Sequence, residues 1–257
     1  MTTEASRAFL EAVRVDLDTH TAVVLTTRLP ESLDAGIAEV LRACLDESEL
    51  RRLSEIQAGT GADAFLVSRA LLRTVLGHLL DLPGRNVELR TSGRGKPSLS
   101  PNASPPVYFN TSHSRTHAVT AVSRIGELGV DVEEVRSIDE RVVRRSLSTE
   151  EYEGLTTLQH DERVGAFFHL WTVKEACAKA TGVGIGLGMR NVGATLDRNG
   201  HWDDYSWESL DLGPGVAAAL AIRTPGVNPE RMSVAAHADV LTALFGIGPR
   251  FAPGGRG

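Results

Sequence analysis

Apolar residues recur with helical spacing in two long segments, at about residues 62–80 and 161–181. In the first segment a broad apolar face is formed by Phe65, Leu66, Leu72, Val75, Leu76 and Leu79. In the second segment the apolar face is formed by Val173, Cys177 and Ala180. This periodicity predicts two long helices that each bury one side.

Shorter patterns predict further elements around the two long helices. Helical periodicity covers residues 32–45, 46–57, 139–145 and 148–158. Runs of β-branched or alternating residues predict strands at 22–27, 87–90, 117–122, 128–133, 191–196, 205–210, 216–222 and 232–237. Another strand is expected to end near Ser114. Each long helix is thus followed along the chain by several strands.

A faint internal repeat accompanies this order of elements. The run LVSRALLRTVLG from Leu66 can be laid on TVKEACAKATGVG from Thr172, which places Arg73 over Lys179. The sequence therefore predicts an α+β protein of two similar lobes, related by pseudo-two-fold symmetry, with an active-site cleft between them. We expect the N-terminal lobe at residues 1–123, the C-terminal lobe at 124–247 and a disordered tail at 248–257.

Composition and charge narrow the classes of function. The chain has 257 residues and a formal net charge of -6 at pH 7, so it shows no electrostatic footprint for nucleic acid or a membrane surface. No run approaches the roughly 20 apolar residues of a membrane span, and no secretory signal is visible at the start. The two cysteines, Cys44 and Cys177, stand apart without metal-ligand spacing. We therefore expect a reduced, cytoplasmic protein.

Two carboxylates share one face of the predicted strand at 128–133. Side chains at i and i+2 of a strand point the same way, so Gly129, Asp131 and Glu133 should lie together, opposite three apolar residues. Their like charges repel unless a cation or water separates them. Oxygen ligands without His or Cys favour a hard cation, magnesium before zinc. The alternative is a solvated end of a strand.

The second long helix carries charged residues at helical spacing. Trp171, Glu175 and Lys179 fall at i, i+4 and i+8 along one stripe, with Lys174 beside it. The alternative is a surface helix with a Glu–Lys pair worth about 0.3–0.5 kcal/mol. The glycine run at 182–188 follows this helix instead of opening one, so it does not match a dinucleotide-binding fingerprint. It closes the helix and permits close approach of the backbone.

Two further segments are candidates for binding an anion. Ser112 and His113 adjoin in the run NTSHS, which suits a shared anion contact better than a serine-hydrolase relay, since no G-x-S-x-G motif is present. The alternative is a capped turn with a satisfied histidine. The loop that contains Lys96 and Pro97 has two glycines ahead of them, a weak pattern that also fits an ordinary hairpin connection.

Taken together, these segments resemble those of a known family. FNTSHS, GVDVE and WTVKEACAK, with GKP upstream, occur in the order and approximate spacing of the 4′-phosphopantetheinyl transferases. The chain resembles the two-lobed, surfactin-synthetase-activating type more than the short trimeric holo-acyl-carrier-protein synthases. The resemblance runs from about Arg69 to Gly188, and the ordered set of motifs is far more specific than any one of them.

The resemblance implies an enzyme that moves the phosphopantetheine arm of coenzyme A to a serine of an apo carrier protein and releases 3′,5′-ADP. By motif position, Mg²⁺ would be held by Asp131, Glu133 and Glu175. The nucleotide and its 3′-phosphate would be contacted from Arg73, Lys96, Pro97, Ser112 and His113, and the pyrophosphate from Lys174 and Lys179. Glu175 would be the general base, and Lys179 would act with it in catalysis. The segment ahead of the Arg73 helix lacks obvious basic residues, because Arg51 and Arg52 lie further back, so we expect no nucleotide contact from it.

The expected partner is an acidic acyl, polyketide or peptidyl carrier protein, as in secondary-metabolite biosynthesis. The segment after the carboxylate strand is a candidate docking surface, formed by Arg136, Arg141, Arg144 and Arg145; its alternative is a solvated helix face. We expect a monomer. Two rival functions use the same residues: a non-catalytic protein that binds coenzyme A or a carrier, and a metal-dependent pyrophosphate hydrolase.

Overall fold

The computed structural model describes residues 3–57, 59–91, 96–99, 105–184, 188–224 and 232–247. The tail predicted at residues 248–257 lies outside the described residues. Two four-stranded sheets and one two-stranded sheet, surrounded by helices, form an α+β structure. The α+β class predicted from the sequence is therefore confirmed. No helix among the described residues is long and apolar enough to cross a membrane.

The first sheet contains strands from both ends of the chain. Its order is β10-β1-β5-β4, with β1 at Ala22–Arg28, β4 at Tyr108–His113, β5 at His117–Ser123 and β10 at Val234–His237. The helices of this half are α1 (Glu4–Thr19), α2 (Ala35–Arg42), α3 (Glu47–Glu55), α4 (Thr60–Leu79) and α8 (Val240–Phe245). Of these, α4 packs on β4 and β5, while α1 and α8 pack on β1.

The second sheet lies in the C-terminal half. Its order is β6-β9-β8-β7, with β6 at Leu128–Glu134, β7 at Asn199–Trp202, β8 at Tyr205–Ser209 and β9 at Val216–Arg223. The helices here are α5 (Glu140–Ser146), α6 (Thr149–Thr157) and α7 (His160–Thr181), of which α7 packs on β6, β8 and β9. The remaining elements are the strands β2 (Arg90–Thr91) and β3 (Pro97–Ser98) and the 3₁₀ turns η1 (Gly84–Asn86) and η3 (Met189–Asn191).

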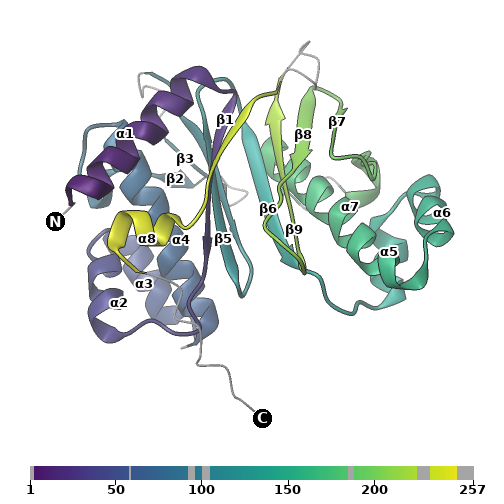
Figure 1. Cartoon of the computed structure of the whole chain (residues 1–257), viewed down its shortest axis with the longest axis horizontal. Helices are drawn as coiled ribbons and strands as arrows, with labels where there is room; N and C mark the ends of the chain where they lie inside the picture. Colours follow the sequence, from purple (N-terminus) through teal and green to yellow (C-terminus); the bar gives the residue numbers. More distant parts are fainter. Residues whose placement is uncertain are drawn as a thin grey trace.

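The two sheets lie side by side in the middle of the molecule, with helices on the outer side of each (Figure 1). Alternate strand residues enter different cores, as the period of a strand requires. In β1, Val23 and Leu25 join the core beneath the helices, whereas Ala22 and Val24 join a third cluster shared with β6 and β9. Strands buried on both faces explain why their sequences are almost continuously apolar.

Most predicted elements are present within a few residues. The two long helices are α4 and α7, and α7 ends at Gly182, whose positive φ of 70° is a left-handed C-cap that glycine adopts without strain. Helix α6 begins with the capping box of Ser148 and Glu151. Helices α1 and α8 and strand β7 were not predicted. For α1 the signal was present, since its buried Leu10, Val13 and Leu17 follow helical spacing.

Three expectations are corrected. The strand predicted at 191–196 is wrong, because η3 and an irregular segment occupy that part of the chain. The strand predicted at 87–90 reduces to the two-residue β2. Residues 234–247 pack with the N-terminal sheet, because β10 pairs with β1 from Ala22↔Val234 to Leu25↔His237 and α8 joins the same core, whereas we expected them in the C-terminal lobe.

Candidate functional site

A close approach between β6 and α7 positions the central residues of the site. A Cβ placed on Gly129 would lie 2.1 Å from the carbonyl oxygen of Ala176 and 2.7 Å from the Cβ of Lys179. Only a residue without a side chain permits this approach. As predicted, Gly129 shares its strand face with Asp131, while Leu128, Val130 and Val132 face the cluster between the sheets. Lys179 is thereby brought against β6.

Lys179 joins both halves of the molecule through three contacts. Its Nζ donates to Asp131 Oδ1 at 2.7 Å, to Ser112 Oγ at 2.9 Å and to the carbonyl oxygen of Val130 at 3.0 Å. Ser112 Oγ in turn donates to Asp131 Oδ1 at 2.9 Å. β4 and β6 are aligned by Asn110, whose Oδ1 accepts from Val130 N at 2.9 Å. Residues far apart in the sequence thus meet where the sheets meet.

Negative charge gathers around this contact. Asp131 is 5% exposed, and its Oδ2 is buried with no hydrogen-bond partner in the part of the chain that the structure describes. Burial raises the pKa of Glu175, as do the negative charges of Asp131 and Glu133, against the opposing effect of Lys179. Glu133 Oε2 accepts from Arg136 Nη1 at 3.0 Å. Among the described residues, no three His, Cys, Asp or Glu side chains come close enough to hold a metal ion between them as they stand.

A cavity of about 610 Å³ opens beside these carboxylates. It is lined by Gly61 and Ala64 of α4, by the segment from His113 to Arg115, and by the segment from Glu133 to Arg136. Burial, followed by the positive charges of Lys179 and Arg69, lowers the pKa of His113. The cavity is therefore lined by His113 and Arg115 from one segment, and by Glu133, Glu134 and Arg136 from the other. A larger cavity of about 770 Å³, which shares Glu134 and Val135 with this one, lies where β1 ends and β5 begins and is lined by none of the predicted site residues.

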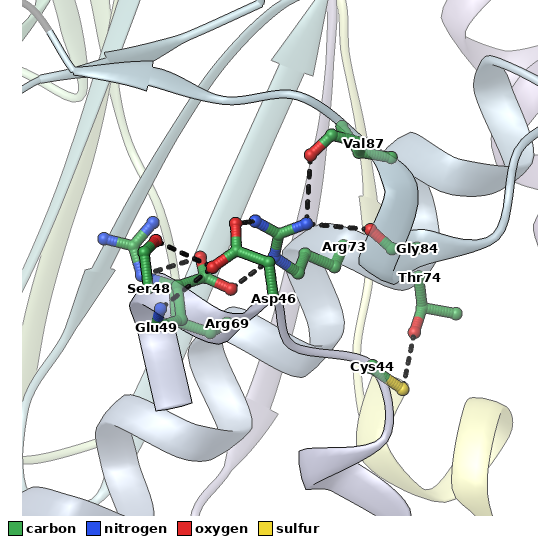
Figure 2. Close-up of polar contacts among 9 residues, drawn as sticks. All are labelled: Cys44, Asp46, Ser48, Glu49, Arg69, Arg73, Thr74, Gly84 and Val87. Atoms are coloured by element: carbon green, nitrogen blue, oxygen red, sulfur yellow. Dashed lines mark hydrogen bonds and ion pairs between the residues drawn. The ribbon is translucent and has the colours of Figure 1, made fainter. Parts of the chain in front are cut away.

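The structure places Arg73 in the interior, apart from this cavity. Its side chain is fully buried, and it pairs with Asp46 and Glu49 at the start of α3. Its Nη1 donates to the carbonyl oxygens of Gly84 at 2.9 Å and Val87 at 3.0 Å (Figure 2). These contacts are those of a residue that holds α3, α4 and the following turn together. They do not support the predicted nucleotide contact of Arg73.

Lys174 is also turned away from the predicted site. It is fully buried, and its Nζ donates to Glu151 Oε2 at 2.7 Å, to the carbonyl oxygen of Met189 at 3.0 Å and to that of Val192. Lys179 also donates to three acceptors, but its side chain is 28% exposed, whereas that of Lys174 is 0% exposed and is closed to a ligand. Burial lowers the pKa of Lys174, and Glu151 opposes that shift. Lys174 joins α6 and η3 to α7, so a pyrophosphate contact is not supported.

Lys96 and Pro97 lie at the opposite end of β6 from Glu133. Lys96 Nζ donates to Glu127 Oε2 at 2.6 Å and to the carbonyl oxygen of Leu128 at 2.9 Å. Pro97 opens β3, opposite Thr91 of β2. The structure therefore brings together Ser112, His113, Asp131, Glu133, Glu175 and Lys179, and it leaves Arg73, Lys96, Pro97 and Lys174 outside that group.

Comparison with known proteins agrees with the geometry. A model of the 4′-phosphopantetheinyl transferase superfamily matches residues 127–208, and a model of the 4′-phosphopantetheinyl transferase N-terminal region matches residues 37–125. The 4′-phosphopantetheinyl transferase HetI of Nostoc is 34% identical over 79% of this chain and 89% of its own length. The chain belongs to the 4′-phosphopantetheinyl transferase superfamily. It is an enzyme that transfers phosphopantetheine to carrier proteins.

The transferase is similar to further members of the same type. The 4′-phosphopantetheinyl transferase psf-1 of Bacillus pumilus is 31% identical over 69% of this chain and 75% of its own length. The 4′-phosphopantetheinyl transferase Sfp of Bacillus subtilis is 30% identical over 68% of this chain and 80% of its own length. The resemblance to the surfactin-synthetase-activating type is therefore confirmed.

The structure also brings together two arginines of the transferase, Arg52 and Arg69, to which the sequence analysis assigned no role. The guanidinium of Arg69 lies 5.5 Å from the centre of the Phe65 ring, and that of Arg52 lies 5.8 Å from the same ring. The positive charge of Arg69 also helps to lower the pKa of His113, after burial and the charge of Lys179. We expected no nucleotide contact from the segment ahead of the Arg73 helix, because Arg51 and Arg52 lie further back along the chain. Only the packing of α3 on α4 brings the two arginines together.

Proposed function

We propose that the transferase binds coenzyme A in the cavity beside His113 and reacts at the junction of Asp131, Glu175 and Lys179. One observation carries this assignment: Lys179 Nζ contacts Asp131 and Ser112 at once, so α7, β6 and β4 meet at a single cationic group. Lys179 is suited to bind the pyrophosphate, because an ammonium group offsets the charge that develops on the leaving phosphate.

We propose a revised set of contacts to the nucleotide. His113, Arg69 and Arg52 replace Arg73 as the groups that face the 3′-phosphate, with Ser112 beside them. The proposal is supported by the effect of Arg69 on His113 and by the shared position of Arg69 and Arg52 over Phe65. Lys96 and Pro97 stay in the proposal as contacts from the β3 loop, although Lys96 already pairs with Glu127.

The carboxylates fit a divalent ion by their chemistry. Asp131 Oδ2 is a buried anionic oxygen that has no hydrogen-bond partner among the described residues, and the negative charge of Asp131 helps to raise the pKa of Glu175, so the two carboxylates lie close enough to share a cation. We propose that Mg²⁺ binds to Asp131, Glu133 and Glu175, for which Glu133 would have to give up Arg136. When bound, the ion would stabilise the charge of the transferred phosphoryl group and its leaving group.

We propose that Glu175 accepts the hydroxyl proton of the carrier serine while the serine oxygen attacks the β-phosphorus of coenzyme A. The bond between that phosphorus and the bridging oxygen of the pyrophosphate breaks, and 3′,5′-ADP leaves with the electron pair. The raised pKa of Glu175 supports this role, because a carboxylate of higher pKa is a better base.

We propose that the two lobes are related by pseudo-two-fold symmetry, with a boundary near residue 123 and residues 232–247 added to the N-terminal lobe. The offset that lays Leu66 on Thr172 also lays α4 on α7, and each of these helices packs on a four-stranded sheet. A monomer in the cytoplasm is part of the same proposal. The free thiols of Cys44 and Cys177 support a reducing setting.

The basic surface after β6 is our proposed docking site for the carrier protein. Three of its arginines already have acidic neighbours: Arg136 pairs with Glu133, Arg141 with Asp139, and Arg144 with Glu140. Arg145 is exposed on α5 and has no acidic partner among the described residues. The exposed Val142, 39% accessible, lies on the same helix. An apolar residue flanked by arginines suits an acidic partner.

Mass spectrometry tests the proposed function directly. Several apo carriers, from fatty-acid, polyketide and peptide synthases, are incubated with the protein, Mg²⁺ and coenzyme A. We expect a phosphopantetheine adduct on at least one carrier, and no turnover with Glu175→Gln or Asp131→Asn despite unchanged circular dichroism. Wild-type rates in either variant would contradict the site. Release of 3′,5′-ADP without any carrier would instead support the pyrophosphate hydrolase, and binding without turnover would support the non-catalytic protein.

A further inference from the structure

Glu49 lies between two arginines of α4. It is 8% exposed, in the first turn of α3, which Asp46 caps. Its Oε2 accepts from Arg73 Nε, and its Oε1 lies 3.8 Å from Arg69 Nε (Figure 2). Because Arg73 is also held by Asp46 and two carbonyl oxygens, the position of the Glu49 carboxylate is fixed from behind.

Arg69 lies on the stripe of α4 that leads to the cavity. Gly61, Phe65 and Arg69 fall at i, i+4 and i+8, and Gly61 lines the cavity together with His113. Burial lowers the pKa of Arg69, and the positive charges of Arg52 and Arg73 lower it further. The carboxylates of Glu49 and Asp46 oppose this shift. Of these two, Glu49 is the one that comes within ion-pair distance of Arg69.

We propose that Glu49 is a positioning residue for coenzyme A. Held by Arg73, it fixes the Nε side of Arg69 and leaves both Nη groups for the phosphoryl anion beside His113. An arginine side chain has many rotamers, so it loses conformational entropy when a ligand immobilises it. When the protein already restricts that freedom, less of it is lost on binding, and the ligand binds more tightly. This inference rests on the proposed function above.

A purely structural role of Glu49 makes a different prediction. If its carboxylate serves only to neutralise the buried Arg73, then Asp46 should be equivalent to it, because both acids pair with the same guanidinium. Glu49→Gln and Asp46→Asn each remove one negative charge from Arg73 and keep the shape of the side chain. Asn also remains a good N-cap for α3. The two variants are therefore matched in charge, but only Glu49→Gln removes a carboxylate that lies within ion-pair distance of Arg69.

Calorimetric titration of the whole chain with coenzyme A and with 3′-dephospho-coenzyme A separates these roles, and it needs no turnover. We expect Glu49→Gln to raise the Kd of coenzyme A about tenfold, which corresponds to about 1.4 kcal/mol. The Kd of 3′-dephospho-coenzyme A should change less than about twofold, and Asp46→Asn should leave both values within about twofold of wild type. Equal effects of the two variants, or an unchanged ratio of the two Kd values in Glu49→Gln, would overturn the proposal.

Two further variants keep the test decisive if Glu49→Gln melts below the assay temperature. Glu49→Asp keeps a negative charge at this position, but its side chain is one methylene shorter and the 3.8 Å contact with Arg69 is lost. The Kd of 3′-dephospho-coenzyme A divided by that of coenzyme A should therefore still fall. In an Arg69→Ala background, Glu49→Asp should have no further effect, because coupled residues are not additive. Additive effects would refute the coupling. Failure of wild type to bind coenzyme A would remove the proposed function itself, and the inference with it.

Discussion

At the scale of single residues, two arginines one turn apart on α4 have different surroundings. Arg73 is fully buried and paired with two carboxylates, whereas Arg69 lies over Phe65 with a 21% exposed side chain.

Arg73→Ala should destabilise the fold by about 3–5 kcal/mol, because it leaves Asp46 and Glu49 without their buried cation. Arg69→Ala should change stability little and weaken coenzyme A binding. Urea unfolding and calorimetry check both; a stable Arg73→Ala variant with impaired binding would contradict this division.

His113 provides a prediction of pH dependence. Burial lowers its pKa below the ordinary value of about 6.5, so the free protein holds a neutral imidazole at pH 7. A phosphate bound beside the ring favours the imidazolium and raises that pKa. Between the two pKa values the complex holds more protons than the free protein, so affinity should rise as the pH falls from the pKa of the complex toward that of the free protein.

Calorimetry in two buffers of different ionisation enthalpy measures the protons taken up on binding. His113→Gln is the control, because coenzyme A itself carries a phosphate with a second pKa of about 6. We expect less proton uptake in this variant than in wild type. If the two proteins take up protons equally, His113 does not contact the anion.

At the scale of elements, the contact of α7 with β6 depends on one glycine. A Cβ at Gly129 would lie 2.5 Å from the backbone nitrogen of Ala180, so Gly129→Ala must push the helix away. We expect a loss of about 1–3 kcal/mol in the free energy of unfolding, with a fall in kcat as Lys179 leaves Asp131. Gly165→Ala on the same helix is the matched control. No described atom lies within 4 Å of a Cβ placed at Gly165, so this variant should gain about 0.5–1 kcal/mol in the free energy of unfolding. Equal behaviour of the two variants would refute the argument.

At the scale of the whole molecule, the basic surface after β6 is the proposed docking site for the carrier protein. The net charge is -6, so a local cluster of arginines suggests a specific acidic protein. Reversing Arg144 and Arg145 to Glu should raise the KM for the carrier, chiefly through slower association, and leave the affinity for coenzyme A unchanged. The effect should shrink with salt, because exposed charges are screened beyond about 8–10 Å.

A charge-matched control is available in the other lobe. Arg7 on α1 and Arg42 on α2 are exposed, and reversing both to Glu changes the net charge by the same amount. We expect carrier kinetics close to wild type in this control. Equal carrier kinetics in all three proteins at low salt would show that the α5 surface is only solvated.

The local faces of the site were determined by the sequence alone. Gly129 and Asp131 share one side of β6, and Glu175 and Lys179 lie one turn apart on α7, because the periods of strand and helix depend only on neighbouring residues. The family followed from the ordered motifs, and the comparisons confirm it. The pairing of β10 with β1 could not be predicted from the sequence, because strand pairing between distant segments leaves no local signal.

Only the tertiary structure decided which cations a ligand can reach. Lys174 and Lys179 lie five residues apart on one helix and each has three acceptors, yet the side chain of Lys174 is 0% exposed, while that of Lys179 is 28% exposed beside Ser112 and Asp131. Arg73 and Arg69 differ in the same way because α3 supplies the partners of Arg73. A buried charge needs a partner, and the partner comes from a distant segment of the chain. Helical spacing places a charged residue on a face, but packing determines whether that residue can meet a ligand.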